Sequence, residues 1–226
     1  LVDSMGSDLS VVNAARVSMH KESDWEFIGQ HPQNNFYEQN LNILADKDIK
    51  LINYLAKHNH WTPFAHAFLS FRIKVPMFVA MQLDKHTVGL VTNSVSRRYV
   101  DEEPEFWFPK EWRGRADNVK QGSGEVIGSE QPRMDISMFV KSETHRASIN
   151  YKELIEVGLA PEMARMVLPM NTMTERIWSG SLAAFSRVCK LRLDPHSQKE
   201  IQELAGMVAV LVEPLFPHSW KALSEN

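Results

Sequence analysis

The sequence predicts an α+β fold in a single domain, because it contains both helical and strand periodicity and the predicted helices outnumber and separate the strands. Apolar residues recur at helical spacing over 46–57, and they alternate with polar residues over 67–75, as in a half-buried strand. With 226 residues, 43% of them hydrophobic, the chain can bury one sizeable core. We therefore expect one domain spanning 1–226.

The N-terminal part of the chain has clear signals for the ends of its elements. Ser7 and Asp8 are residue types that cap helices, and Pro76 ends the alternating segment because proline has no N–H to donate to a ladder. The expected elements are, in order, a helix from Ser7 through Val17, a polar loop over 21–35, a helix over 46–57, a strand over 67–75 and a short buried helix over 77–83.

The C-terminal part is mostly helical after a glycine-rich and polar stretch over 102–131, which predicts an excursion or lid. Asp194 followed by Pro195 is typical of a helix start and predicts the beginning of the last helix. The expected elements are a helix over 135–157 stopped by Gly158, a short helix from Pro161, a strand over 174–179, a helix over 181–191 and the last helix.

Composition excludes several classes of protein. A net charge of −3 and a pI near 6.3 do not favour nucleic acid or an anionic membrane as partner, so any phosphate site must be a local cluster of basic residues. A single cysteine excludes an intrachain disulfide framework and fits a reducing cytosol. We also find no signal peptide and no apolar run long enough to cross a membrane, and we expect a cytoplasmic protein.

The segment 82–99, QLDKHTVGLVTNSVSRRY, is the most informative part of the chain. Lys85 with His86, and Arg97 with Arg98, bracket a run of small hydroxyl and amide side chains. Arginine forks grip phosphate, and short polar side chains read a polar ring. The segment therefore favours an anionic ligand such as a nucleotide, and a solvated loop with scattered charge is the alternative.

Three histidines lie in the segment 58–66, HNHWTPFAH, but they do not form a convincing metal site. No cysteine or carboxylate accompanies them, and Pro63 prevents a regular helix from aligning His60 with His66. We expect no metal here, and neutral imidazoles that line a cofactor pocket are the better interpretation. Cys189 has no flanking activation pattern, so we expect a buried structural cysteine rather than a nucleophile.

Three arginines lie among apolar neighbours, where an unpaired charge would be costly. Arg16 is expected to form a surface ion pair or to have a functional role. Arg165 and Arg192 are expected to meet an acidic side chain or a ligand anion. Arg192 precedes the helix start predicted at Asp194, where backbone N–H groups favour anions, and His196 falls within that first turn.

Taken in order, five segments resemble the flavin-dependent thymidylate synthases, and the resemblance runs through nearly the whole chain. The third segment is similar to the family signature, commonly written RHRxxSxNExSxRY. The KQGSGE stretch and the KHTVGL…SRRYVD pattern most resemble the viral branch of the family. A viral protein of this kind is expected in the cytoplasm of the host. The five segments are LVDSMGSDLSVVNAARVS, HNHWTPFAH, QLDKHTVGLVTNSVSRRY, EMARMVLPMN and LRLDPHSQKEIQ.

The resemblance implies a mixed or antiparallel sheet with flanking helices, a homotetramer, and FAD bound where subunits meet. The implied reaction is the reductive methylation of dUMP to dTMP. Methylenetetrahydrofolate supplies the carbon, reduced FAD the hydride, and NADPH regenerates the flavin. This reaction needs no cysteine nucleophile, in agreement with the interpretation of Cys189.

The resemblance also assigns residues. Arg192 matches the position that contacts the uracil edge and stabilises the negative charge that develops in the reaction, which makes it the implied catalytic residue. Arg98 and Arg165 match positions that hold the phosphate. The positions matching dUMP contacts are Gln82, Ser96, Arg97, Arg98, Arg165 and Arg192, and those matching FAD contacts are Ser18, His60, Thr62, Lys85, His86, Thr87 and His196.

Several positions depart from the family pattern. The arginines of RHR are Lys85 and Thr87, and the glutamate that usually follows asparagine is Ser94. Ala65 stands where PFEH has glutamate, and Arg187 stands where an asparagine is expected near the flavin. Two alternatives therefore stay open: a related folate- and flavin-dependent pyrimidine nucleotide hydroxymethylase, and a non-catalytic nucleotide-binding relative that has lost the flavin.

Overall fold

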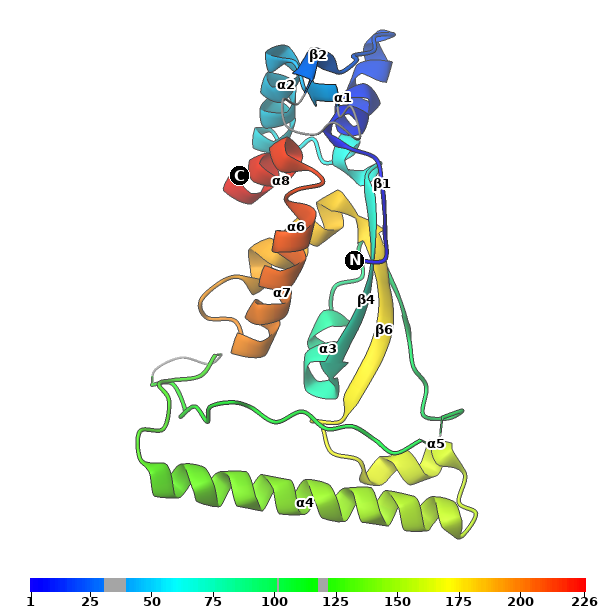
Figure 1. Cartoon of the computed structure of the whole chain (residues 1–226), viewed down its shortest axis with the longest axis vertical. Coiled ribbons are helices and arrows are strands. Elements are labelled where there is room, and N and C mark those ends of the chain that lie inside the picture. Colours follow the sequence, from blue (N-terminus) through cyan, green and yellow to red (C-terminus); the bar gives the residue numbers. More distant parts are fainter. Residues whose placement is uncertain (31–39, 101, 118–121) are drawn as a thin grey trace.

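A four-stranded antiparallel sheet runs along the long axis of the protein (Figure 1). This computed structural model describes residues 1–30, 40–100, 102–117 and 122–226. The expected α+β class is confirmed, and the sheet is antiparallel rather than mixed. In their order across the sheet the strands are β1 (Asp3–Met5), β4 (Phe68–Pro76), β6 (Met173–Ser181) and β5 (Leu90–Ser94).

The central strand β4 is where the period-two pattern predicts it. Leu69, Phe71, Ile73 and Val75 are buried on one face of the sheet. Phe71 pairs with Trp178 of β6, and the Phe71 ring meets the Phe185 ring edge-to-face with centroids 5.0 Å apart. Each such side chain stabilises the fold by about 1.5–3 kcal/mol when it leaves water.

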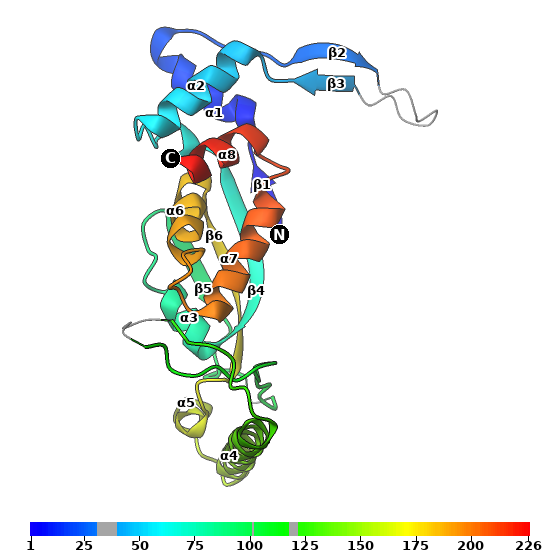
Figure 2. The same ribbon diagram turned by 90° about the vertical axis from the view of Figure 1, so that its left-hand side faces the viewer.

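Helices cover this buried face, and Figure 2 shows α6 and α7 lying over the sheet. Their apolar sides complete the core with side chains such as Leu182, Phe185, Ile201 and Val208. The helices are α1 (Asp8–Arg16), α2 (Asp46–Lys57), α3 (Met77–Leu83), α4 (Glu130–Glu156), α5 (Pro161–Ala164), α6 (Leu182–Arg192), α7 (Lys199–Val212) and α8 (Pro217–Glu225), with short 3-10 turns at Val17–Met19, Pro63–Ala65 and Arg165–Val167.

The two ends of the elongated molecule differ. At one end α1 and α2 pack together, and the hairpin of β2 (Glu26–Gln30) and β3 (Asn40–Ile43) projects from them (Figure 2). At the other end lies the long helix α4 (Figure 1). The polar loop expected over 21–35 is therefore wrong in part, because Glu26–Gln30 is a strand, while 31–35 lies outside the described residues. Cross-strand pairing, not local pattern, makes this strand.

The cap predicted at the start of α1 is confirmed and has a second role. The Ser7 side chain accepts the backbone N–H of Ser10, and Ser10 returns the bond in a capping box. Asp8 is buried, and its carboxylate accepts the backbone N–H groups of His218 and Ser219 at 2.9 Å each. Asp8 therefore joins α1 to the first turn of α8, a helix that the sequence interpretation missed.

The helix start predicted at Asp194 is wrong. The Asp194 carboxylate accepts the backbone N–H of His196 at 2.8 Å, which closes a tight turn instead. Helix α7 begins at Lys199 and has Gln198 at its N-cap position. The Asp194 side chain therefore bonds to the local backbone of the turn and does not cap the helix.

The stretch between β5 and α4 contains no helix and no multi-residue strand in its described part before α4 begins at Glu130. It is tied down by single bridges, Phe106 to Thr172 and Arg113 to Val126, and its Trp112 indole donates to Ser137 Oγ of α4 at 2.7 Å. A lid function for 102–131 stays a prediction. Among the residues placed by the structure, no helix has the length and apolar character needed to cross a bilayer.

Candidate active site

Three of the residues assigned from the sequence meet where α3 and α6 end. Arg192 is the last residue of α6, and its Nε donates to His86 Nε2 at 2.9 Å. Its Nη2 group also approaches the backbone oxygen of Gln82, at 3.4 Å. Arg192 and His86 are half-buried, so this cation is fixed in place while its remaining N–H groups are not used by these two contacts.

Burial and the contact with Arg192 together favour the neutral form of the His86 imidazole. Burial, and then the positive charge of Arg192, lower the pKa of His86 below its ordinary value. Burial also lowers the pKa of Arg192, which remains a cation at neutral pH because its ordinary value is so high. Neutral His86 therefore accepts at Nε2 and carries its proton on Nδ1.

A chain of polar contacts continues from Gln82 to residues that the sequence interpretation did not assign to the site. The Gln82 amide donates to Gln198 Oε1, and Gln198 in turn donates to Glu200 Oε2 at 2.8 Å. Glu200 also forms an ion pair with Arg113, whose Nε donates to Ser123 Oγ at 2.6 Å. The polar QKE sequence at the start of α7 is the only signal that could have indicated Gln198 and Glu200.

A second group of predicted residues lines a cavity of about 330 Å³ at the end of the sheet near α5. Arg97 and Arg165 both line it, together with apolar side chains including Met170. Arg97 donates to the backbone oxygen of Glu102 at 2.8 Å. Arg165 is exposed and donates to the backbone oxygen of Glu162; of the two partners expected for it, an acidic side chain is not found among the described residues, and a ligand anion stays a prediction. Three cations, Lys74, Arg97 and Arg165, thus border one cavity of nucleotide size, together with the acidic residues Glu102, Glu103, Glu105 and Glu175.

Ser96 and Arg98 lie next to this cavity but are not among its lining residues. Arg98 Nε is 3.4 Å from Ser96 Oγ, and its guanidinium lies 5.1 Å from the centroid of the Tyr99 ring. The loop expected as the alternative for 82–99 is wrong in part. Residues of this segment end α3 and form β5, which pairs with β6 along the edge of the sheet.

Three of the predicted FAD residues lie toward the end of the molecule that holds α1 and α2. Ser18, His60 and Thr62 are exposed, and Ser18 Oγ donates to the backbone oxygen of Ala15 at 2.9 Å. His60 lines a cavity of about 220 Å³ together with Trp61 and other residues. His60 of HNHWTPFAH thus lines a cavity, and the expectation that its imidazole faces a cofactor stays a prediction.

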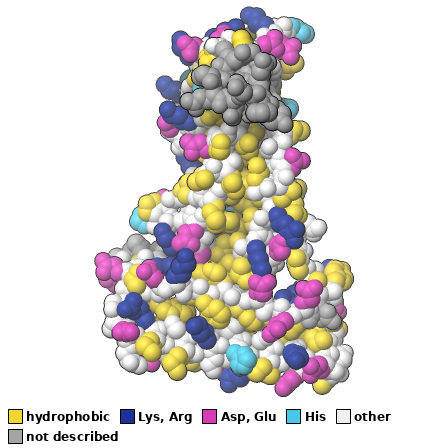
Figure 3. Space-filling view, viewed as in Figure 1, with side chains coloured by type: hydrophobic (Ala, Val, Ile, Leu, Met, Phe, Trp, Pro, Cys, Tyr) yellow, Lys and Arg dark blue, Asp and Glu magenta, His cyan; other side chains and the backbone are white. Residues whose placement is uncertain are grey.

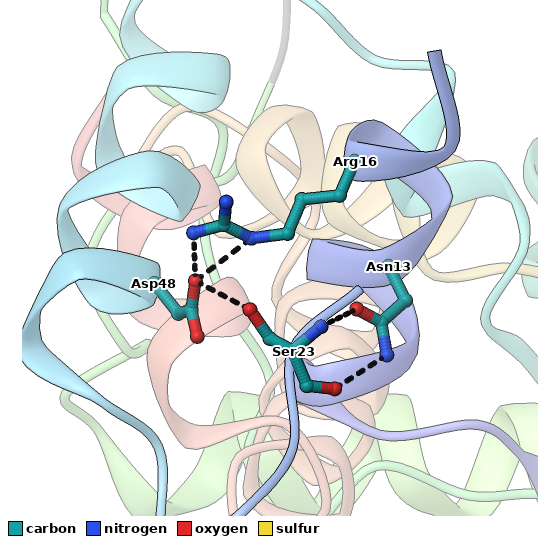
Figure 4. Close-up of polar contacts among 4 residues, drawn as sticks. All are labelled: Asn13, Arg16, Ser23 and Asp48. Carbon is teal, nitrogen blue, oxygen red and sulfur yellow. Dashed lines mark hydrogen bonds and ion pairs between the residues drawn. The ribbon is translucent and has the colours of Figure 1, made fainter. Parts of the chain in front are cut away.

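The turn that holds Ser18 is anchored by a buried polar cluster (Figure 4). Arg16 forms an ion pair with Asp48 of α2, whose side chain is fully buried, and Asp48 Oδ1 also accepts from Ser23 Oγ at 3.1 Å. The Asn13 side chain exchanges two hydrogen bonds with the backbone of Ser23. The ion pair expected for Arg16 is therefore present, but it is not on the surface, since the Arg16 side chain is only 15% exposed.

The other predicted FAD residues besides His86, namely Lys85, Thr87 and His196, are exposed near the Arg192 cluster. Arg187 connects them to the His60 cavity. It lines that cavity, and its Nη2 donates to the backbone oxygen of Val88 at 2.9 Å. The sequence interpretation named Arg187 only as a departure from the family pattern. In the fold, Arg187 lies between the predicted FAD residues near Arg192 and those near the His60 cavity.

The structure places Cys189 in the core, as expected, and burial raises the pKa of its thiol to about 12. A thiol in this environment is not a nucleophile at neutral pH. Within the described ranges, no three histidine, cysteine, aspartate or glutamate side chains are grouped so that they could hold a metal ion.

Comparisons with known proteins agree with this architecture. Residues 1–218 match the Thy1 family, described as thymidylate synthase complementing protein. The flavin-dependent thymidylate synthase of Thermus thermophilus is 35% identical over 226 residues, covering 100% of this chain and 75% of that protein. That of Thermosipho africanus is 35% identical over 222 residues, covering 98% and 88%.

A solved structure has the same fold. The UMP/dUMP methylase PolB from Streptomyces cacaoi, bound with 5-Br UMP, superposes with a TM-score of 0.81 at 25% identity, covering 100% of this chain and 92% of that one. The viral branch expected from the KQGSGE stretch stays a prediction, since these relatives are bacterial. The match along nearly the entire chain is decisive: the chain belongs to the Thy1 family of flavin-dependent thymidylate synthases.

Proposed function

We propose that this enzyme methylates dUMP to dTMP, with methylenetetrahydrofolate as carbon donor and with FAD and NADPH as the source of reducing equivalents. The observation that carries the proposal is Arg192, a half-buried cation held against neutral His86 and the Gln82 backbone. A fixed cation in a partly dry site stabilises developing negative charge without reorganising during the reaction.

Arg192 would act on the uracil ring. When C5 attacks the transferred carbon, negative charge develops on the ring oxygens and N3. A guanidinium held from one side by His86 can direct its remaining N–H groups to that charge. This interaction strengthens as the charge grows, so it favours the transition state over the ground state.

The arginines near the second cavity would hold the phosphate. Arg97 and Arg165 line the cavity of about 330 Å³, and Arg98 lies beside it. Charge-assisted bonds from such guanidinium groups stabilise a bound phosphate by roughly 1.5–3 kcal/mol each when water is excluded. The rest of the lining is mixed: apolar side chains such as Met170 lie beside Lys74 and four glutamates, and Glu105 is paired with Lys74.

FAD fits the donor set around Arg187. The His60 cavity offers an exposed indole at Trp61 for stacking, and two cations, Arg187 and Lys190, for a diphosphate. When bound, FAD would supply the hydride that reduces the transferred carbon. At about 220 Å³ the cavity can hold only part of this cofactor, and the remaining predicted contacts are exposed. We therefore propose that a second subunit completes the site, within a homotetramer.

One observation favours a second candidate substrate. PolB, with which the fold superposes at a TM-score of 0.81, is described as a UMP/dUMP methylase. UMP, the ribonucleotide, is therefore the second candidate for this chain. The two substrates differ only by the 2′-hydroxyl group, which needs a polar partner when it is buried.

The test is to record the flavin absorbance of the purified protein and then to measure tritium release from 5-tritiated dUMP and 5-tritiated UMP. We expect flavin absorbance, and tritium release that requires methylenetetrahydrofolate and NADPH. Mass spectrometry of the product then distinguishes a methyl group from a hydroxymethyl group. A flavin-free protein that binds dUMP without releasing tritium would instead support the non-catalytic alternative.

A further inference from the structure

We propose that Glu200 fixes which end of the Gln82 amide faces the ligand, and that this orientation selects uracil over cytosine. The inference rests on the proposed function for the identity of the nucleotide, and it concerns two residues at the start of α7, Gln198 at its N-cap and Glu200 in its first turn. Glu200 and Gln198 are positioning residues, because they act on the ligand only through Gln82.

The argument begins with the carboxylate, which can only accept hydrogen bonds. One oxygen of Glu200 receives the Arg113 guanidinium, and the other receives the Gln198 amide nitrogen at 2.8 Å. Since the Gln198 nitrogen is turned to Glu200, its oxygen faces Gln82. Gln82 must then donate with its own nitrogen, as it does. The oxygen Gln82 Oε1 is left as the free end of the chain.

The residue that carries this oxygen belongs to the site already described. Gln82 lies one turn before His86, and its backbone oxygen is the group that Arg192 Nη2 approaches. Within the part of the chain that the structure describes, Gln82 Oε1 accepts no hydrogen bond from the protein. Gln82 therefore carries an available side-chain acceptor, and its own backbone oxygen lies against the cationic donor Arg192.

This pattern matches the edge of uracil. Uracil presents an N3–H donor between two carbonyl oxygens, so N3–H can donate to Gln82 Oε1 while a carbonyl oxygen accepts from Arg192. Cytosine presents an unprotonated N3, whose lone pair would face the lone pairs of Gln82 Oε1. Leaving these two acceptors unpaired in a partly buried site is costly, so cytosine is rejected.

The surroundings of Glu200 keep it an acceptor. Burial raises the pKa of this carboxyl, but hydrogen bonds from Arg113, its own backbone and Gln198 outweigh burial and lower the pKa overall. Arg113 is itself held by Ser123 Oγ at 2.6 Å. At neutral pH the carboxylate is therefore ionised, and the amide chain has only one favourable direction.

The decisive variant is Glu200→Gln, which keeps the shape but can donate as well as accept, so the Gln198 and Gln82 amides are free to reverse. Calorimetric titrations of the flavin-loaded enzyme with dUMP and with dCMP give the ratio of the two affinities. We expect this ratio to fall at least about tenfold, the effect of one misdirected hydrogen bond. Glu203→Gln, at an exposed position on the same helix, should leave the ratio unchanged.

A second variant covers the case in which Glu200→Gln fails to fold. Gln198→Leu cuts the chain but keeps the Glu200–Arg113 pair, so it should lower the same ratio. An unchanged dUMP-to-dCMP ratio in a folded variant of either kind overturns the inference and leaves the proposed function intact. If the wild-type enzyme binds dUMP no better than dCMP, both the inference about Glu200 and the proposed preference for a uracil nucleotide are wrong.

Discussion

The contact between Arg192 and His86 joins the two residues whose chemistry matters most at the candidate active site. The guanidinium donates and the imidazole accepts, and burial together with the charge of Arg192 lowers the pKa of His86 and favours its neutral form. Neither residue has a carboxylate partner in the hydrogen bonds of the described structure, which leaves the positive charge of Arg192 available to a ligand.

The first prediction concerns Arg192→Lys. Lysine keeps a charge but loses the planar, two-point contact. We expect turnover of dUMP to fall ~100-fold or more, as when one preorganised donor is removed. Reduction of the flavin by NADPH without folate should change far less, because no uracil chemistry occurs then. Stopped-flow absorbance separates the two half-reactions, and a slow flavin reduction with intact methyl transfer would reassign Arg192 to the flavin.

The second prediction concerns pH. The pKa of His86 is lower in the folded protein than its ordinary value of 6.5, so the unfolded chain binds a proton more readily. The neutral imidazole therefore contributes fully above about pH 6.5, and stability is lost as the pH falls from there towards the lowered folded-state pKa. His86→Gln should flatten this part of the curve of unfolding free energy against pH. Equal slopes for the variant and the wild type would contradict the lowered pKa.

At the level of elements, the buried cluster of Figure 4 connects α1 to α2 and to the segment that leads into the β2–β3 hairpin. Arg16 and Ser23 both bond to one oxygen of Asp48, while Asp48 Oδ2 is buried and has no hydrogen-bond partner among the described residues. A buried carboxylate with a single charged partner depends strongly on that partner. Ser18 follows Arg16 by two residues, so the cluster also holds the turn that presents it.

The third prediction is that Arg16→Ala lowers the free energy of unfolding by about 3–5 kcal/mol, because it leaves the Asp48 carboxylate buried without a counter-charge. Urea unfolding monitored by circular dichroism measures the change. Lys47→Ala removes an exposed charge next to Asp48 in sequence and should change stability by less than about 0.5 kcal/mol. A similar small loss for both variants would show that water reaches the Asp48 site.

At the scale of the whole molecule, the outer side of α7 is an exposed apolar surface. Met207, Val210 and Leu211 are exposed there, with Val210 at 70%, although the opposite side of the helix is in the core. The space-filling view also shows apolar side chains over the middle of the molecule (Figure 3). Apolar side chains exposed over so much of a surface are typical of proteins that assemble.

The fourth prediction is that the exposed apolar face of α7 is a subunit contact, so that Val210→Asp buries a charge there and reduces the mass of the assembly measured by light scattering. Flavin occupancy should fall with the mass, since the proposed FAD site needs a second subunit. Lys50→Asp adds the same acidic side chain at an exposed position on α2 and should leave both quantities unchanged. A wild-type monomer that carries a full complement of flavin would contradict the proposed assembly.

The local sequence pattern was sufficient to predict several secondary-structure elements of this protein. The alternation of β4, the apolar stripe of α2 and the cap of α1 were all readable, because each depends on residues that are neighbours in the chain. The order of five motifs was also sufficient for the family. These features need no knowledge of distant contacts.

Other features depended on partners far away in the chain. Strand β5 exists because it pairs with β6, and Asp194 closes a turn instead of capping α7. Arg113 meets Glu200 across 87 residues of sequence, and no local signal predicts which of several arginines will do so. Hydrogen bonds between distant segments form only when the core brings those segments together. The sequence pattern therefore indicates which residue types the site contains, and tertiary packing decides which individual residues meet.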